Sequence, residues 1–295
     1  MNIYSVDMEK LYVNNNGELL ENNEPSIRAG NRAHLYGDGL FESIRVISGK
    51  PINLEVHILR LKEGMAALKM RIPNFFTVSF FEKQIETLLS HSGIKNGGRI
   101  RLSVDRSRGG TYTPATNEVS FLIEAHPLEN NQFLLNNKGL EVDLFTEIKK
   151  ENNKLANFKT KNGLIYILGA IEAQEKDLDD LLILNNKGGI IESTNSNLFV
   201  VSNGVLYTPS LDEGCLGGTM RMTIINMALE NNIKVYESAI TPQNLLIADE
   251  VFLSNAINGV KWVGGYRTKR YMNTISMKFI HLLNEKFSNQ TMTAE

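Results

Sequence analysis

Apolar runs rich in β-branched residues alternate along the chain with stretches whose apolar residues recur every three or four positions. The first pattern is typical of strands and the second of helices, so a mixed α/β (α+β) fold is expected. Strands are predicted at residues 39–47, 99–104, 118–124, 140–145, 181–184, 197–201, 204–207 and 251–254. Helices are predicted at residues 54–70, 80–89, 162–175, 219–229, 242–248 and 274–287. In the first helix, Val56, Leu59, Met65 and Leu68 are expected to share one buried face.

A polar stretch divides this pattern into two parts. Residues 129–138 are mostly asparagine, glutamine and charged residues around three apolar ones, which is typical of a linker. The total length of 295 residues also fits two domains better than one. We therefore predict an N-terminal α/β domain at 1–128 and a C-terminal domain at 139–295, joined by this linker.

Composition excludes several classes of protein. The chain is 42% hydrophobic and 22% charged, and no apolar run approaches the roughly 18 residues of a membrane span, so no membrane partner is expected. A net charge of -2 gives no reason to expect nucleic acid as a partner. Cys215 is the only cysteine, and the histidines lack ligand-like spacing with acids, so neither a disulfide within the chain nor a metal site is predicted. The first residues lack the pattern of a secretory signal, so a cytoplasmic location is expected.

Two separated residues suggest covalent chemistry. Lys159 stands ahead of a predicted helix, and Glu192 precedes a predicted strand. A lysine amine condenses with an aldehyde only when it is neutral, so burial or a nearby positive charge must lower its pKa. Pyridoxal phosphate needs such a lysine, an acid facing its ring nitrogen, and an anion site for its phosphate.

The anion site is predicted where Gly217 and Gly218 lead into a helix at Thr219. The N–H groups of a first helical turn, the helix dipole and the close approach that glycine allows together favour a phosphate. Read without context, such a pair of glycines is more often only a turn. A polar loop at Ser254-Asn255-Ala256 and the charge of Arg60 are further candidates.

Five motifs in order resemble one family. They are Gly37-Asp38-Gly39 with the strand that follows, His57-Ile58-Leu59-Arg60-Leu61, the lysine segment, the segment from Glu192 to Asn197-Leu198-Phe199, and the glycine-led helix. Together they resemble the class IV, or fold type IV, pyridoxal-phosphate enzymes, from about Arg28 to Val263. That family includes branched-chain aminotransferases, D-amino-acid aminotransferases and aminodeoxychorismate lyases.

The resemblance implies a two-domain fold type IV enzyme with a smaller N-terminal α/β domain and a larger C-terminal domain that has a mixed, barrel-like β core. It also implies a homodimer that binds pyridoxal 5'-phosphate. Lys159 resembles the catalytic Schiff-base lysine, because Asn162 follows at the spacing of the lyase and D-amino-acid branches, and that spacing decides against Lys161. Glu192 resembles the carboxylate that meets the pyridine nitrogen. The phosphate would be bound by Arg60, on a helix that His57 helps to position, and by the backbone amides of Thr219, Met220, Asn255 and Ala256.

The substrates are expected to be a small-molecule amino acid and a 2-keto acid. Positions in the family's substrate pocket match Tyr36, Arg45 and Arg101, and a loop that would reach over the pocket contains Arg106 and Arg108. Arginine binds carboxylates in a paired geometry. A structural ion pair is an equally good explanation for any one of these arginines.

Three functions remain open. The favoured one is amino-acid aminotransferase, which Glu42 supports because it resembles the aminotransferase branches. The second is aminodeoxychorismate lyase, releasing pyruvate and 4-aminobenzoate, which Asn255-Ala256 supports. Gly163 and Leu164 stand where typical branched-chain aminotransferases have a tyrosine, which counts against that branch. The third is a non-catalytic binding protein on the same scaffold.

Overall fold

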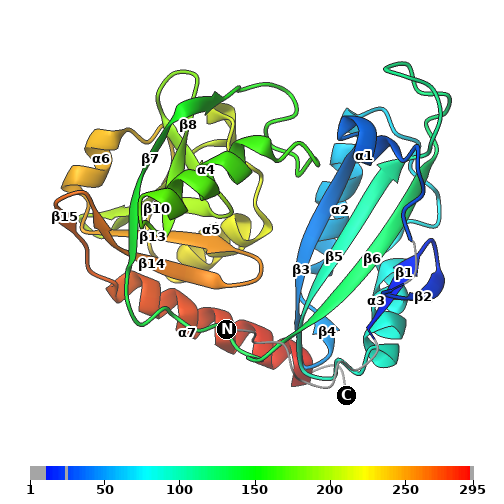
Figure 1. Cartoon of the computed structure of the whole chain (residues 1–295). Coiled ribbons are helices and arrows are strands. Elements are labelled where there is room, and N and C mark those ends of the chain that lie inside the picture. The colour runs from blue at the N-terminus through cyan, green and yellow to red at the C-terminus, as the bar shows by residue number, and fades with distance from the viewer. Residues whose placement is uncertain (1–10, 24–25, 293–295) are drawn as a thin grey trace. The chain divides into compact units, whose positions relative to one another are not determined.

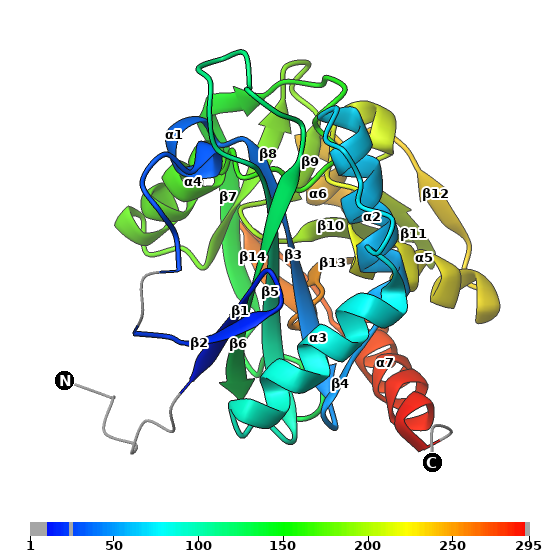
Figure 2. The same cartoon turned by 90° about the vertical axis from the view of Figure 1, so that its right-hand side faces the viewer.

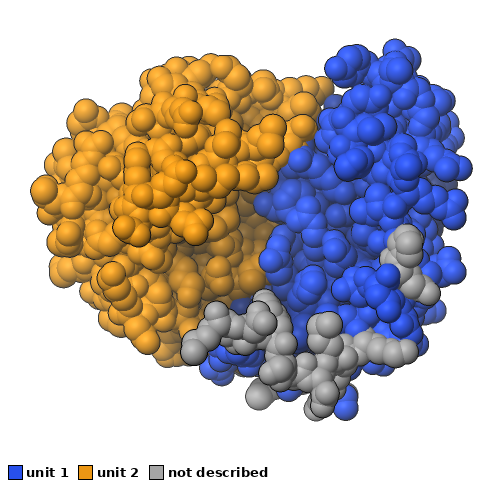
Figure 3. All heavy atoms as spheres, in the orientation of Figure 1, with its two compact units in different colours: residues 1–132, 159–161, 293–295 blue, residues 133–158, 162–292 orange. Residues whose placement is uncertain are grey.

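The computed structural model describes residues 11–23 and 26–292, and Figure 1 shows their helices and strands. These residues form two compact units (Figure 3). Unit 1 contains the chain up to Gln132 together with Lys159–Lys161, and unit 2 contains Phe133–Phe158 and Asn162–Met292. The change from unit 1 to unit 2 falls inside the stretch predicted as a linker, and the linker itself stays a prediction. The return of Lys159–Lys161 to unit 1 was not expected from the sequence.

Unit 1 is a six-stranded sheet with two long helices on one face (Figure 2). The strands, in sheet order, are β2 (Glu18–Glu21), β1 (Tyr12–Asn15), β6 (Val119–Leu128), β5 (Gly97–Arg106), β3 (Gly39–Ile47) and β4 (Lys50–Pro51). The helices are α1 (Arg32–Tyr36), α2 (Leu54–Ala67) and α3 (Val78–His91).

The two faces of strand β3 have different roles. Leu40, Glu42 and Ile44 alternate onto the face that packs against α2, where both apolar residues are almost fully buried. Phe41 and Arg45 therefore lie on the opposite face. A carboxylate in the middle of the core face requires polar partners, because burying an unpaired charge is costly.

Unit 2 is built on a nine-stranded mixed sheet. Its strands are β7 (Leu140–Lys150), β8 (Asp180–Asn185), β9 (Ile190–Ser193), β10 (Asn197–Ser202), β11 (Val205–Thr208), β12 (Val235–Glu237), β13 (Glu250–Asn255), β14 (Gly259–Tyr266) and β15 (Lys269–Arg270). Its helices are α4 (Leu164–Glu175), the 3-10 turn η1 (Leu211–Glu213), α5 (Thr219–Glu230), α6 (Pro242–Ile247) and α7 (Thr274–Met292).

Six of these strands close into a barrel. The order β10-β13-β14-β7-β8-β9 returns to its start because Asn197 of β10 pairs with Glu192 of β9. The pairings β14–β7 and β7–β8 are parallel and the other four are antiparallel. This arrangement confirms the mixed α/β fold with a barrel-like β core that was expected for the C-terminal part.

Strand β8 shows why its sequence lacks polar alternation. Leu182 and Leu184 belong to a core cluster shared with residues of β10 and β13, whereas Leu181 and Ile183 pack with Ala173 of α4. Both faces of β8 are thus covered, so its apolar run is continuous.

The structure corrects one predicted helix face and adds elements. The buried face of α2 consists of Leu54, His57, Ile58, Leu61, Gly64 and Met65. Leu59, predicted to be buried, is 56% exposed. The buried face includes His57 and Gly64, so its centre lies to one side of the face that the apolar residues alone predict. Strand β14 was not predicted, since its three glycines interrupt the apolar pattern. Among the described residues, no helix is both long and apolar enough to cross a membrane.

Candidate functional site

Lys159 lies beside the Gly-Asp-Gly motif in unit 1. The Phe41 N–H donates to the Lys159 carbonyl at 3.0 Å, and the Lys161 N–H donates to the Gly39 carbonyl at 2.9 Å. These bonds form an antiparallel bridge between Leu40 and Thr160. The Lys159 Nζ sits 4.6 Å from the centre of the Phe41 ring. Two motifs that are about 120 residues apart in the sequence are therefore joined directly.

Lys161 has a different environment. Its ammonium forms an ion pair with Asp105 Oδ1 at 2.5 Å, and only 18% of its side chain is exposed. Because the ion pair holds its ammonium and a positive charge prevents attack on an aldehyde, Lys161 is the weaker candidate for a Schiff base. The assignment of the Schiff base to Lys159 stays a prediction.

Arg60 is held by a buried carboxylate. Its guanidinium donates from Nε to Glu42 Oε1 at 2.9 Å and from a second nitrogen to Glu42 Oε2, a paired arrangement. The His57 Nδ1 lies 2.6 Å from the same Oε2. Glu42 and His57 are each 1% exposed. The Arg60 side chain is therefore fixed in direction from α2 by groups beneath it.

Electrostatics connects this cluster to the lysine. Burial lowers the pKa of His57, and the charges of Arg60 and Lys159 act in the same direction. Both cations therefore lie within electrostatic range of one imidazole ring in unit 1. Burial acts to raise the pKa of Glu42, but the charge of Arg60 and the hydrogen bond from His57 outweigh it and lower the pKa to about 2. Glu42 is thus ionised over the whole physiological range.

Glu42 is expected to support the stability of unit 1 in a pH-dependent way. Because its folded pKa lies below the unfolded value of 4.5, its contribution is full above pH 4.5 and is lost as the pH falls toward 2. A pKa shift of this size corresponds to a contribution of roughly 3 kcal/mol to the free energy of unfolding. The lowered pKa of His57 adds a loss that begins as the pH falls through 6.5, since the unfolded ring protonates there.

Urea unfolding of the wild type and of Glu42→Gln at pH 7 and pH 3 measures this contribution. The variant should be less stable by a few kcal/mol at pH 7, and the difference should shrink at pH 3. A Glu82→Gln variant, changed at an exposed position of α3, serves as the control. An equal difference at both pH values would contradict the role given to the ionised carboxylate.

The aspartate of the Gly-Asp-Gly motif binds two arginines. Asp38 Oδ2 accepts from Arg32 Nε at 2.8 Å and from Arg106 Nε at 2.9 Å. Arg106 also donates to the carbonyl of Leu68 and to Asn117, and it is 7% exposed. These contacts give Arg106 a structural function, and its predicted contact with substrate remains a prediction.

Arg32 forms hydrogen bonds with the backbone of the loop that follows β5. Its Nη1 donates to the carbonyls of Gly109 and Thr111, at 3.0 and 2.7 Å. Its guanidinium also lies 4.9 Å from the ring centre of Tyr36, which in turn is 5.7 Å from the ring of Tyr112. The predicted substrate residue Tyr36 therefore belongs to a cluster with this loop, and it is 37% exposed.

The remaining predicted arginines occupy three different places. Arg45 is buried and donates to the carbonyls of Asn130 and Gln132, at 2.6 and 2.8 Å. Arg101 lies 3.9 Å from the ring centre of Phe41, the ring that Lys159 also contacts, and burial lowers its pKa. Arg101 is therefore the predicted substrate arginine that shares a neighbour with Lys159.

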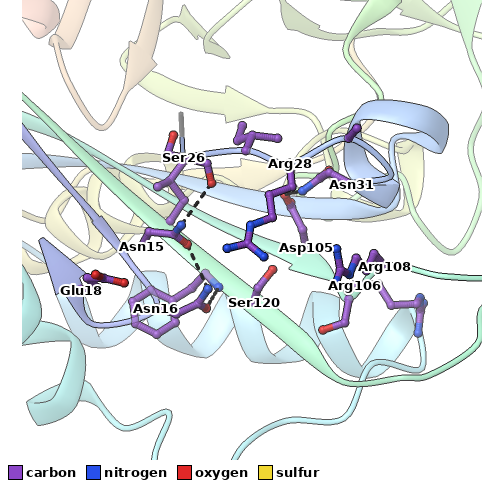
Figure 4. A pocket seen from close by; sticks show the side chains of 15 residues that line it. Asn15, Asn16, Glu18, Ser26, Arg28, Asn31, Asp105, Arg106, Arg108 and Ser120 are labelled. Atoms are coloured by element: carbon purple, nitrogen blue, oxygen red, sulfur yellow. Dashed lines mark hydrogen bonds between the residues drawn. The ribbon is translucent and has the colours of Figure 1, made fainter. Parts of the chain in front are cut away.

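Arg108 is exposed and lines a polar cavity of about 510 Å³ in unit 1. Arg28, Asn31, Asp105, Arg106 and Ser120 also line it, and in Figure 4 the Arg28 side chain points into it. The Arg106 guanidinium is already bound by Asp38. Arg28 and Arg108 thus supply further cationic groups to this cavity.

Glu192 is the centre of a polar cluster in unit 2. Its Oε1 accepts from Lys150 Nζ at 2.7 Å and from the Tyr166 hydroxyl at 2.9 Å. Its Oε2 accepts from the backbone N–H of Leu216 at 2.9 Å. Glu192 is 4% exposed, so this carboxylate is buried and surrounded by donors. Burial raises the pKa of Tyr166, with the charge of Glu192 acting in the same direction, so the hydroxyl keeps its proton.

Leu216 connects Glu192 to the start of α5. The helix begins at Thr219, and its N-cap residue Gly218 has no side chain to cap the first turn. A Cβ at Gly218 would lie 2.0 Å from Asn197 Oδ1, so the close approach of this loop to β10 requires glycine. Thr219 and Met220 are both buried. The predicted carboxylate and the predicted anion site are therefore parts of one connected region of unit 2.

Asn255 ends β13 and shapes the turn into β14. Its Oδ1 accepts from the N–H groups of Ile257 and Asn258, and its amide nitrogen donates to the Ser196 hydroxyl at 3.0 Å. Its side chain thus stabilises the turn, and Ala256 lies within that turn. The predicted phosphate contacts of the Asn255 and Ala256 amides stay predictions.

Several residues of the cluster were not found from the sequence. Lys150 stands among other charged residues at the end of β7, and nothing in the sequence distinguishes it from its neighbour Lys149. Tyr166 lies two residues beyond the position where a tyrosine was sought, and its place on the first turn of α4 was the available signal. Phe41 was only part of the strand predicted after the Gly-Asp-Gly motif, and Arg32 was not identified at all. Among residues 11–23 and 26–292, no group of three His, Cys, Asp or Glu side chains could hold a metal ion.

Known proteins resemble this chain over most of its length. Residues 39–263 match the model of the family described as amino-transferase class IV. The protein of Methanocaldococcus jannaschii named "Putative branched-chain-amino-acid aminotransferase" is 30% identical, with 83% of each chain covered. A D-alanine aminotransferase of Bacillus licheniformis is 26% identical over 81% of this chain and 83% of its own. An aminodeoxychorismate lyase of Vibrio harveyi is 26% identical over 80% of this chain and 86% of its own.

Solved structures share the fold. The branched-chain aminotransferase of Thermoproteus uzoniensis with norvaline superposes with a TM-score of 0.84 at 23% identity, covering 93% of both chains. The T.th. branched-chain amino acid aminotransferase with pyridoxamine 5'-phosphate gives a TM-score of 0.84 at 22% identity, covering 94% of this chain and 93% of that one.

Proposed function

Because the chain belongs to the class IV aminotransferases, a family of enzymes that use pyridoxal phosphate, we propose that it moves an amino group between an amino acid and a 2-keto acid. The observation that carries this proposal is the Glu192 cluster. A buried carboxylate that accepts from the N–H of Leu216, two residues before the N-cap of α5, places an acceptor for a ring nitrogen in the same region as the N–H groups of a helix start, which favour a phosphate.

Each unit contains residues that suit a part of the cofactor. Lys159 would bind its aldehyde, Glu192 would accept its ring N–H, and Arg60 would contact its phosphate together with the amides of Thr219, Met220, Asn255 and Ala256. Glu192 Oε2 accepts from Leu216 alone among the described residues and so keeps a lone pair for one more donor. The first turn of α5 receives no side-chain cap from Gly218. Both features match what a protonated pyridine and a phosphate require.

When bound, pyridoxal phosphate supplies an aldehyde and a ring that withdraws electrons from the substrate Cα. The residues of this chain then have separate tasks. Lys159 takes the proton from Cα once its amine is released. Glu192 would accept a hydrogen bond from the protonated ring nitrogen through its Oε2. Arg60, fixed by Glu42, orients the phosphate end.

The substrate is proposed to present a carboxylate to Arg101. That guanidinium and Lys159 contact the same Phe41 ring, at 3.9 and 4.6 Å from its centre. Glu124 Oε2 is 3.8 Å from Arg101 Nε, which is a long and therefore weak ion pair. A substrate carboxylate that forms two parallel hydrogen bonds with the guanidinium would bind it more strongly. The other proposed substrate contacts do not share the Phe41 ring with Lys159; they are Tyr36, Arg45, Arg106 and Arg108.

Replacing Gly218 is expected to weaken cofactor binding. In Gly218→Ala the added methyl group collides with the Asn197 side chain, which is held by Ser254, so either this side chain or the start of α5 must shift. We expect the dissociation constant of pyridoxal phosphate to rise roughly tenfold, which corresponds to the loss of about one hydrogen bond to a charged group. Gly163→Ala is the matched control, since its added Cβ meets nothing within 4 Å at the N-cap of α4. Equal affinity in both variants would contradict the anion site.

Aminodeoxychorismate lyase is the second candidate, because a lyase is among the relatives at nearly the same identity as the D-alanine aminotransferase. The same lysine would remove the Cα proton in both reactions. The purified protein should therefore be incubated with D- and L-amino acids plus 2-oxoglutarate, and separately with aminodeoxychorismate. Keto-acid formation supports the aminotransferase, whereas release of 4-aminobenzoate without transamination replaces it with the lyase.

We also propose that the protein is a cytoplasmic homodimer, as the family resemblance implies. Light scattering of the purified chain measures its mass in solution. A value near twice 33.1 kDa is expected, and an active monomer would contradict the proposal.

A further inference from the structure

The two oxygens of the Glu192 carboxylate have unequal surroundings. Oε1 accepts two hydrogen bonds, from Lys150 and from Tyr166, which fill its lone pairs. Oε2 accepts one, from the Leu216 N–H, among the described residues. A carboxylate held in this way can offer only one oxygen to a further donor.

Lys150 is placed to fix this asymmetry. It is the last residue of β7, and its side chain is 13% exposed. Its ammonium also donates to the carbonyl of Ala156 at 3.0 Å, so two of its three N–H groups are committed to neighbours in unit 2. The Tyr166 ring centre lies 5.7 Å from the same nitrogen. The position of Lys150 is therefore determined by several contacts at once.

We infer that Lys150 is a positioning residue, which reserves Glu192 Oε2 for the cofactor's ring nitrogen and keeps the shared proton on that nitrogen. This inference rests on the proposed function. A proton moving from the ring to Glu192 would neutralise the carboxylate and leave the mostly buried ammonium of Lys150 without its counter-charge, which is costly. The proton accordingly stays on the ring, where it is needed to withdraw electrons.

The location of the proton can be measured directly. The protein is loaded with pyridoxal phosphate that carries ¹⁵N in the ring, and the ¹⁵N chemical shift is recorded at pH 7.5. The wild type should show the shift of a protonated pyridine. In Lys150→Met, which keeps the length of the side chain but removes its charge, the signal should move toward that of an unprotonated pyridine. Lys150→Arg, which keeps charge and donors, should restore the wild-type signal.

Two further variants make the result decisive. Lys149→Met changes the exposed neighbouring lysine and should leave the signal unchanged. Glu192→Gln should move it as far as Lys150→Met or farther. If Glu192→Gln moves the signal and Lys150→Met does not, the inference about Lys150 is wrong and the proposed function stands. If neither moves it, the proposed contact between Glu192 and the ring nitrogen fails.

Folding is checked by thermal unfolding of each apoprotein. If Lys150→Met does not fold, Lys150→Gln replaces it, because it keeps a donor while removing the charge. An unchanged ¹⁵N signal in a folded, cofactor-loaded Lys150→Gln protein would overturn the inference equally.

Discussion

The Lys159→Ala protein is expected to lose both turnover and the visible absorbance that bound pyridoxal phosphate gives when joined to a lysine. The amine is the group proposed to hold the aldehyde and to move the Cα proton, so the change removes two tasks at once. A fall in kcat of roughly 10⁴-fold is expected from losing the base alone. Absorbance spectra and single-turnover rates of the purified, cofactor-saturated protein measure the two effects separately.

Lys161→Ala is the matched control for this variant. Lys161 is two residues away, and its ammonium is paired with Asp105. Its removal should reduce stability slightly and leave the absorbance and the Cα proton transfer in place. A Lys159→Ala protein that keeps its absorbance while Lys161→Ala loses it would transfer the role to the second lysine. Retention of both properties in both variants would contradict a lysine-bound cofactor.

Glu192→Gln should lower kcat by roughly 100-fold or more while the protein still binds pyridoxal phosphate. The amide has nearly the same shape, but it carries no charge to hold a proton on the ring nitrogen, and oriented charge stabilisation of this kind is commonly worth that factor. The substrate KM should change much less, since Glu192 is not proposed to contact substrate. The loss should be visible in pre-steady-state proton abstraction measured with substrate deuterated at Cα.

The control for Glu192→Gln is Glu172→Gln. Glu172 lies on α4 and pairs with the exposed Lys176, so its change should leave kcat within twofold of the wild type. A Glu192→Gln protein with wild-type kcat would show that the carboxylate serves the fold of unit 2 and not the reaction.

The sequence predicted much of the fold because local patterns determine it. Strand β3 was predicted with its observed limits, since alternating apolar residues follow a glycine and continue to Ile47. Strand β7 was predicted five residues too short, because its last part is exposed and charged and so shows no apolar period. The barrel closure through Asn197 and Glu192 depends on contacts between strands, which no local period encodes.

The candidate site was predictable to a similar extent and for similar reasons. Lys159, Arg60 and Glu192 stand in motifs, and motifs are visible in a single sequence. Their partners are not: Lys150 and Tyr166 meet at Glu192 from a strand and a helix that are distant in sequence from it, by 42 and 26 residues. The bridge between Lys159 and the Gly39–Phe41 segment is likewise a tertiary contact.

The central claim is that Lys159 carries the cofactor, and one measurement tests it most directly. The cofactor-loaded protein is treated with borohydride, digested, and analysed by mass spectrometry with fragment ions that separate Lys159 from Lys161. We predict a phosphopyridoxyl group on Lys159. The same group on Lys161 or another lysine, or on no lysine of a protein that turns over substrate, would contradict this claim.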